Sequence, residues 1–501
     1  MPAMTDFADC IKADTGQPAH IIHLVEAKAL DAWLATRPDQ TRALLAAQKF
    51  RAKPHETAIL PAEREGDWMV VAGVADKGAL GPWCLARLAE TLPEGRYRLA
   101  EGSPGAAMLG WLLAQHRFDR YRREDNVVGS RQLLTSDVAR IAPAIDLARA
   151  VALVRDLVNT PAADMGPAEL EAATETVAKP FGATVVVTRG DALAQGYPMI
   201  HAVGRAADRH FAPRLIELNW GDPAAPRIAI VGKGISFDSG GLDIKPSSGM
   251  RLMKKDMGGA AHALALAQLI MAARLPVRLH LLIPAAENAI SGNAFRPGDI
   301  LRSRKGLTVE IGNTDAEGRL VLGDALARAA EEKPELIVDF ATLTGAARVA
   351  VGPDLPALFA NDDGLATDLA QAGTDVDDPT WRLPLWEAMP ICSSPTSPTS
   401  TMRAKADLPA RSPLLCSCSV SCPTIRHGCI SIPSPGGHRP SPAARKAAKR
   451  WGCARCSACC SSVTGRIRKA SHSAWTLRNR IGHHALSPHE RPHSTRSGCR
   501  H

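Results

Sequence analysis

Four carboxylates in residues 228–345 have the types and spacing to hold metal ions. Asp238 follows a predicted strand, Asp256 precedes a predicted helix, and Asp315 and Glu317 lie between a strand and a helix. Buried like charges repel, so such a cluster persists only with protons, basic partners or metal ions. With no His or Cys ligand, it favours Mn²⁺, Mg²⁺ or Zn²⁺. Two ions roughly 3.5–4 Å apart could bridge a nucleophilic water.

Each of these residues also has an ordinary interpretation. Asp256 could simply favour the helix dipole, and Asp315 and Glu317 could be turn or capping residues. Lys233 and Lys245 would normally be solvated surface lysines. These alternatives are the better explanation of each residue in isolation, but they explain the whole set poorly.

Basic and glycine-rich residues around the carboxylates give further indications of which ligand the region binds. Arg319 stands at a predicted helix start, where its charge opposes the dipole, which favours a ligand-facing role. The glycine-dense stretch 231–241 contains Gly-Lys-Gly but lacks the order of a phosphate-binding loop. Nucleotide binding is therefore a weak interpretation.

Several motifs resemble those of the leucyl aminopeptidase (cytosol aminopeptidase) family, and the resemblance runs from about Leu153 to Trp386. The most specific is the octapeptide Asn-Thr-Asp-Ala-Glu-Gly-Arg-Leu at 313–320. The others are Val231-Gly-Lys-Gly-Ile-Ser-Phe-Asp-Ser-Gly-Gly, Lys245, Lys-Asp256-Met-Gly-Gly-Ala-Ala, Asn159-Thr-Pro and Ala341-Thr-Leu-Thr-Gly.

The resemblance implies a set of ligands for two divalent ions, Mn²⁺ or Zn²⁺. Asp238 and Glu317 would bridge both ions. Lys233, as a neutral amine, and Asp256 would complete one site. Asp315 would complete the other through its carboxylate and its backbone carbonyl. A dication can hold a lysine amine deprotonated despite its reference pKa of about 10.4.

The resemblance also implies the catalytic groups. Lys245 would polarise the scissile carbonyl, and Arg319 would hold a bicarbonate ion that acts as general base, helped by backbone near Gly318 and Leu343. The expected activity is release of N-terminal amino acids, with a leucine-type preference, from peptides with a free N-terminus, by a water bridged between two metals. The family usually assembles as a hexamer.

Composition and hydrophobic pattern indicate a multidomain protein of α/β class. The chain of 501 residues exceeds one ordinary core. A small α/β domain is expected over 1–140, with 117–136 as a linker, followed by a catalytic α/β domain over 141–390. There, apolar strands alternate with helices, which predicts a mixed, mostly parallel central sheet. Without a signal peptide or an uninterrupted apolar span, we expect a cytoplasmic protein and no membrane partner.

Residues 391–501 differ from the rest of the chain. They hold 18 Lys and Arg and 2 acids, a net charge of +16, which leaves 42 − 49 = −7 for residues 1–390. Ten of the 12 cysteines also lie there. A metal site at 453–460 is a weak interpretation, because no second Cys or Cys/His pair accompanies it. A disordered basic arm could bind nucleic acid, again on weak evidence from composition alone.

The tail is better explained by a shifted reading frame. A frame that begins at the third base of each codon allows Ile391 to Leu415 to encode a stretch starting Met-Leu-Lys-Ser-Asn-Ile-Ala-Asp. Likewise, Ser441 to Ala454 allows Pro-Gly-Arg-Pro-Glu-Gly-Gly-Glu. Both resemble C-terminal motifs of the family. We therefore expect an irregular, disordered tail and a C-terminally incomplete catalytic domain. The alternative functions are an inactive truncated pseudoenzyme or a DNA-binding family member.

Sequencing of the gene across codons 385–395 tests the shifted frame. We expect a single inserted or missing base, after which the restored frame encodes the family-like stretches. A verified, uninterrupted frame without a family-like overlapping frame would refute this interpretation.

Overall fold

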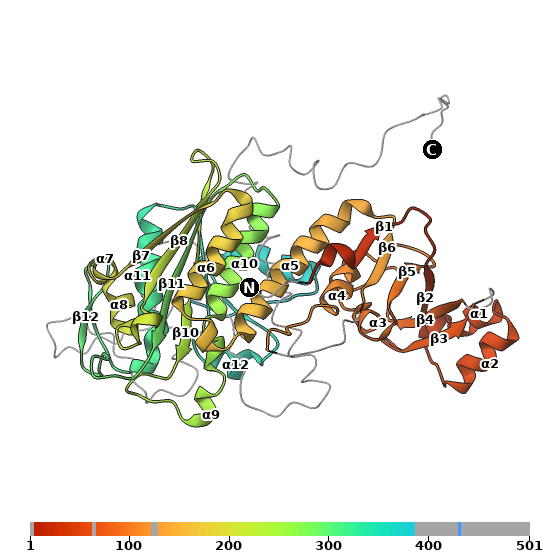
Figure 1. The fold of residues 1–501 in the computed structure, drawn as a ribbon, viewed down its shortest axis with the longest axis horizontal. Coiled ribbons are helices and arrows are strands. Elements are labelled where there is room, and N and C mark those ends of the chain that lie inside the picture. Colours follow the sequence, from red (N-terminus) through yellow and green to blue (C-terminus); the bar gives the residue numbers. More distant parts are fainter. Residues whose placement is uncertain (1–4, 63–66, 122–128, 386–428, 432–501) are drawn as a thin grey trace, which may run out of the picture.

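The computed structural model describes residues 5–62, 67–121, 129–385 and 429–431. They form two α/β domains, with helix α5 (Ile141–Asn159) lying between them (Figure 1). Helix α5 packs on α4 (Met108–Leu113) of the N-terminal domain and on α10 (Gly258–Ala272) of the larger domain. One hydrophobic cluster therefore runs from the first domain into the second. The predicted α/β class with a separate N-terminal domain is confirmed.

The N-terminal domain is built on a six-stranded sheet in the order β1-β6-β5-β2-β4-β3, in which only β3 is antiparallel to its neighbour. The strands are β1 (Ile11–Ala13), β2 (His20–Glu26), β3 (Thr57–Pro61), β4 (Trp68–Val74), β5 (Gly95–Leu99) and β6 (Arg131–Thr135). The other helices are α1 (Leu30–Ala35), α2 (Asp39–Ala47) and α3 (Ala86–Thr91).

The linker predicted over 117–136 is wrong at its C-terminal end. Strand β6 lies inside that range and pairs in parallel with both β1 and β5. Its five residues mix charged, polar and apolar types, so the segment has little apolar periodicity, although Leu133 and Leu134 are both buried. Pairing on both sides, which is a tertiary property, therefore makes this segment a strand.

The larger domain has a mixed sheet in the order β16-β15-β17-β14-β9-β11-β8-β7, and β10 also pairs with β11. Strands β14, β9 and β11 run parallel, whereas β8 is antiparallel to both β11 and β7. The strands are β7 (Thr184–Arg189), β8 (Arg214–Trp220), β9 (Arg227–Gly232), β10 (Gly234–Asp238), β11 (Arg278–Asn288), β14 (Leu336–Ala341), β15 (Ala357–Phe359), β16 (Trp381–Arg382) and β17 (Cys429–Ser431).

Helices cover both faces of this sheet, as the near-continuous apolar strands predict. In β9, Ile228 and Ile230 join the cluster with α5, α6 and α10, while Ala229 and Val231 join the cluster with α7, α8 and α11. The elements not yet given are α6 (Pro167–Ala178), α7 (Asp191–Gly196), α8 (Pro198–Gly204), α9 (Ser247–Met250), α11 (Glu317–Glu331), α12 (Ala346–Val351), α13 (Asp363–Asp375) and the hairpin β12 (Ile300–Arg302) and β13 (Thr308–Glu310).

Helix α10 begins unusually close to the sheet because its second residue is glycine. A Cβ on Gly259 would lie 2.3 Å from the carbonyl oxygen of Phe340 and 2.9 Å from the amide nitrogen of Lys233. Without that atom, Lys233 donates its backbone N–H to Phe340 and accepts one from Ala260. The start of α10 is thereby fixed against the end of β9, where the first candidate ligand stands.

The tail was predicted to be irregular, but the part of it that the structure describes is a strand, β17. It lies between β14 and β15, parallel to the first and antiparallel to the second. The rest of the tail, including its cysteine cluster, lies outside the described residues.

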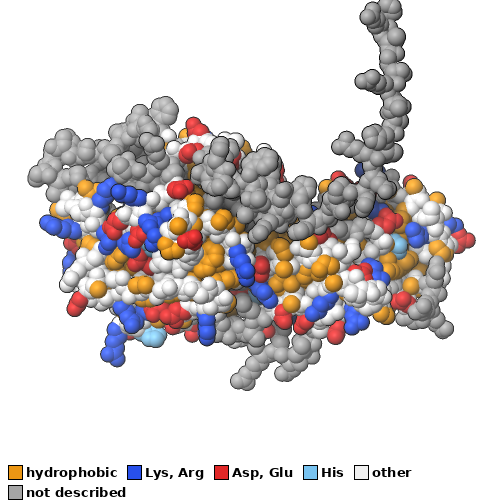
Figure 2. All heavy atoms as spheres, turned by 90° about the horizontal axis from the view of Figure 1, so that it is seen from above, with side chains coloured by type: hydrophobic (Ala, Val, Ile, Leu, Met, Phe, Trp, Pro, Cys, Tyr) orange, Lys and Arg blue, Asp and Glu red, His pale blue; other side chains and the backbone are white. Residues whose placement is uncertain are grey.

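Charged side chains of both signs lie on the described surface. On the face shown in Figure 2, basic and acidic side chains are interspersed. No helix in the described part of the chain is both long and apolar enough to span a membrane.

Candidate metal centre

The candidate ligands meet because the strands that carry them end, and the helices that follow begin, at one edge of the sheet. Lys233 lies between β9 and β10, and Asp238 is the last residue of β10. Asp315 lies in a short 3₁₀ helix (Thr314–Ala316), and Glu317 begins α11. Asp256 precedes α10. The structure therefore brings together five residues that span more than 80 positions of sequence.

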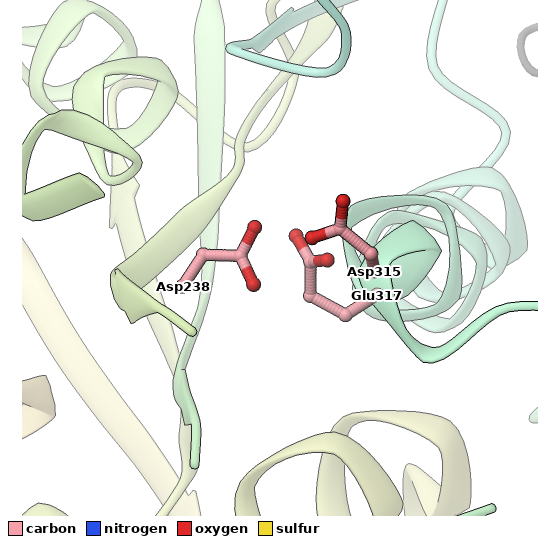
Figure 3. A group of neighbouring side chains, drawn as sticks. All are labelled: Asp238, Asp315 and Glu317. Carbon is pink, nitrogen blue, oxygen red and sulfur yellow. The ribbon is translucent and has the colours of Figure 1, made fainter. Parts of the chain in front are cut away.

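Three of the carboxylates face one another across a short gap. One oxygen each of Asp238, Asp315 and Glu317 can be chosen so that all lie within 4.8 Å of one another. Figure 3 shows Asp238 pointing toward the other two from the opposite side of the gap. Such convergence of carboxylates is the geometry of a site for hard or borderline divalent ions.

The group is deeply buried and ion-paired. Lys233 is 2% exposed and Glu317 is 1% exposed. The Nζ atom of Lys233 lies 2.7 Å from Oδ2 of Asp256 and 2.9 Å from Oε1 of Glu317. The Nζ atom of Lys245 lies 2.9 Å from Oδ2 of Asp238 and also pairs with Asp315.

The pKa values reveal how much negative charge is confined here. Burial, together with the charges of Asp238 and Asp256, raises the pKa of Glu317 to about 7 against the opposing effect of Lys233. Burial also raises the pKa of Asp315. For Lys233, burial acts to lower the pKa, but the carboxylates of Asp256, Glu317 and Asp238 outweigh it and raise the pKa. The cluster therefore strongly favours additional positive charge.

Two buried oxygens offer a direct test of whether a metal pair fits. Oδ2 of Asp256 and Oε2 of Glu317 are inaccessible to solvent and accept no hydrogen bond from the described residues. Oδ2 of Asp256 has only its ion pair with Lys233. A buried polar atom without a hydrogen bond is costly, and a cation is the partner that a carboxylate oxygen accepts most readily. The residues present fit a metal centre.

The candidate bicarbonate-binding residues lie next to this group. A Cβ on Gly318 would lie 2.7 Å from Nζ of Lys233 and 3.0 Å from Cδ1 of Leu343. Arg319, the next residue of α11, is exposed. The structure thus brings Gly318 and Leu343 together beside Lys233, and glycine is required at 318 for that approach.

Three further residues of the site were missed by sequence reasoning. Thr342 donates a hydrogen bond of 2.7 Å to Oδ1 of Asp256, and Nζ of Lys255 lies 3.2 Å from the same oxygen. Asn288 donates a hydrogen bond of 2.9 Å to Oδ1 of Asp238. Lys255 and Thr342 lie within the motifs around Asp256 and Ala341, so the sequence offered a reason to consider them. Asn288 lies in none of the motifs, so the sequence offered no such reason.

Comparison with known proteins gives matches to two family models. The model of the cytosol aminopeptidase family, catalytic domain, matches residues 152–405, half of the chain. The model of the M17 aminopeptidase N-terminal domain matches residues 21–133. The chain belongs to the cytosol aminopeptidase family.

Individual relatives agree with this membership. A probable cytosol aminopeptidase of Leifsonia xyli subsp. xyli is 40% identical over 365 residues, covering 69% of this chain and 73% of the relative. One from Roseiflexus castenholzii is 40% identical, covering 60% of this chain and 64% of the relative. Peptidase B of Pectobacterium carotovorum is 45% identical, covering 48% of this chain and 57% of the relative. The chain thus spans less than two thirds of the length of the latter two.

Solved structures of the family share the fold. The cytosol aminopeptidase from Coxiella burnetii superposes with a TM-score of 0.80 at 37% identity, covering 92% of this chain and 99% of that one. The bottromycin maturation enzyme BotP in complex with Mn superposes with a TM-score of 0.76 at 27% identity, covering 92% and 100%. The family resemblance predicted from the motifs is therefore confirmed.

The raised pKa of Glu317 predicts a pH dependence of metal binding. A carboxyl that titrates at about 7 holds its proton below that pH, and a divalent ion must displace the proton to bind. Lys233, whose pKa is also raised, must likewise lose a proton to bind as a neutral amine. The affinity for Mn²⁺ should therefore fall as the pH decreases from about 8 to about 6, by up to about tenfold per pH unit for each proton displaced. Equilibrium titration at several pH values, with circular dichroism to confirm an unchanged fold, measures this. Equal affinity at both ends of the range would contradict it.

Proposed function

We propose that this protein is a metal-dependent aminopeptidase that releases N-terminal amino acids, with a leucine-type preference, from peptides. The observation that carries the proposal is the buried convergence of Asp238, Asp315 and Glu317 beside two ion-paired lysines. Membership of the cytosol aminopeptidase family supports the same activity. The solved Mn complex of BotP supports manganese as one of the metals.

The chain offers ligands for two divalent ions, Mn²⁺ or Zn²⁺. Lys233 and Asp256 would hold one ion, Asp315 the other, and Asp238 and Glu317 both. When bound, the ions supply Lewis acidity and lower the pKa of a water molecule between them. Support comes from one buried oxygen each of Asp256 and Glu317, for which the described part of the chain supplies no hydrogen-bond donor in suitable geometry.

Lys245 would act on the peptide carbonyl. Burial acts to lower its pKa, but Asp238 and Asp315 outweigh burial and raise it, so the side chain stays cationic at neutral pH. Its ammonium group can therefore donate a hydrogen bond to the scissile carbonyl and to the negative charge that develops there. Such preorganised donors are commonly the largest single contribution to catalysis of acyl transfer.

Arg319, with backbone near Gly318 and Leu343, would hold a bicarbonate ion that supplies a general base. The exposed guanidinium of Arg319 is a planar donor suited to a carbonate-like anion. The absence of a side chain at Gly318 lets the side chains of Lys233 and Leu343 approach its backbone closely.

The same proposal covers the substrate, the cellular location, the assembly and the roles of the domains. The free amine of the peptide would be bound at the metal centre, so a blocked N-terminus would prevent cleavage and the enzyme would be an exopeptidase. From the family we also propose a cytoplasmic location and a hexameric assembly. We further propose that 141–390 is the catalytic domain, that 1–140 is a separate domain and that 391–501 arises from a shifted frame.

Substitution of Lys245 tests the activity. In the full 501-residue chain with Mn²⁺, we expect wild type to hydrolyse leucine amide and Lys245→Ala to lower kcat by about 100-fold or more, as loss of an oxyanion donor does. Exposed Lys305 provides the matched control, and Lys305→Ala should stay within about twofold of wild type.

Three outcomes would contradict the proposal. Wild-type-like turnover by Lys245→Ala would remove Lys245 from the mechanism. A folded wild-type chain that binds Mn²⁺ but releases no leucine would favour the truncated pseudoenzyme. Hydrolysis of N-acetyl-leucine amide at the same rate as leucine amide would reject the exopeptidase.

A further inference from the structure

Asn288 contacts two of the segments that carry candidate metal ligands. It is the last residue of β11 and is fully buried, with 0% exposure. Its Nδ2 donates one hydrogen bond to Oδ1 of Asp238 at 2.9 Å and another to the carbonyl oxygen of Thr314 at 3.1 Å. A single amide therefore joins the end of β10 to the residue before Asp315.

The two oxygens of Asp238 have different surroundings as a result. Oδ1 accepts the hydrogen bond from Asn288 and a second one from the backbone N–H of Gly240, also at 2.9 Å. Two donors occupy the hydrogen-bonding capacity of that oxygen. Oδ2 is left to the cluster, where Nζ of Lys245 lies 2.9 Å away.

Asp256 has the same division, made by different residues. Its Oδ1 accepts a hydrogen bond from Thr342 at 2.7 Å and lies 3.2 Å from Nζ of Lys255. Its Oδ2 lies 2.7 Å from the ammonium nitrogen of Lys233. In both aspartates, neighbouring donors thus fix one oxygen and leave the other to the cluster.

The space around Asn288 is shaped to its amide. Gly241 has a φ of +64°, and a Cβ there would lie 2.9 Å from Oδ1 of Asn288 and 3.0 Å from Oγ1 of Thr314. An aspartate in place of Asn288 would have the same shape but no N–H donors. It would also place a carboxylate oxygen against Oδ1 of Asp238, where the two would repel.

We propose that Asn288 is a positioning residue that holds Asp238 so that its Oδ2 serves both metal positions, and that Thr342 does the same for Asp256 at one position. This rests on the function proposed above, in which Asp238 bridges two ions and Asp256 binds one. Partners that orient metal ligands typically contribute 10–100-fold, as an order of magnitude, to metal affinity or activity. Substitution of Asn288 should therefore weaken the binding of both metal ions, and substitution of Thr342 should weaken the binding of one.

Titration of the metal-stripped 501-residue chain with Mn²⁺ alone tests the proposal. We expect two Mn²⁺ ions to bind to wild type. Asn288→Asp and Asn288→Ala should each weaken both steps by about tenfold or more, whereas Thr342→Val should weaken only one. Asn219, exposed on β8 of the same sheet, provides the matched control, and Asn219→Asp should leave both steps unchanged.

Circular dichroism and thermal unfolding in EDTA separate a positioning role from a structural one. Folded Asn288 variants that bind both ions as tightly as wild type, or that lose only one step, overturn the proposal. Loss of the metal-free fold in both Asn288 variants also overturns it, because the side chain would then support the fold rather than the ligands. If wild type binds no Mn²⁺, the proposed function itself fails, which is distinguishable from failure of Asn288 alone.

Discussion

Four carboxylates lie close together, those of buried Asp238, Asp256 and Glu317 and of half-buried Asp315, and like charges in such a place repel strongly. Lys233 and Lys245 compensate part of this charge through ion pairs. The raised pKa of Glu317 and its buried Oε2, which accepts no hydrogen bond from the described residues, show that compensation is incomplete. A demand for additional cations thus follows from the chain's own residues and gives the family resemblance its physical content.

The fold concentrates this charge at one edge of the central sheet. Lys233 follows β9, and Asp238 is the last residue of β10. Helix α10 starts just after Asp256, and α11 starts at Glu317. Close approach of these elements depends on glycine at two places. Gly259 lets α10 approach the end of β9, and Gly318 lets α11 pass beside Lys233. A methyl group at either position would overlap backbone or ligand atoms, and overpacking of this kind typically costs about 1–3 kcal/mol.

The sequence indicated the fold class and the candidate ligands more clearly than it indicated how those side chains are held. The ligands lie in dense motifs, and buried strands such as β9 and β14 are continuous apolar runs. Asn288 could not be recognised, because its contacts with Asp238 and Thr314 join segments 50 and 26 residues away. Strand β6 was missed for a related reason, since its pairing partners are distant and its own pattern is weak. Strand β17 likewise depends on β14 and β15, not on any regularity of the tail.

The central claim is that the buried carboxylates form a site for two divalent ions. Anomalous X-ray scattering at the manganese edge, from crystals of the full chain grown with Mn²⁺, tests it most directly. We predict two peaks roughly 3.5–4 Å apart among Asp238, Asp315, Glu317 and Lys233, as in other two-metal sites. A single peak, or no peak there in crystals saturated with Mn²⁺, would contradict it.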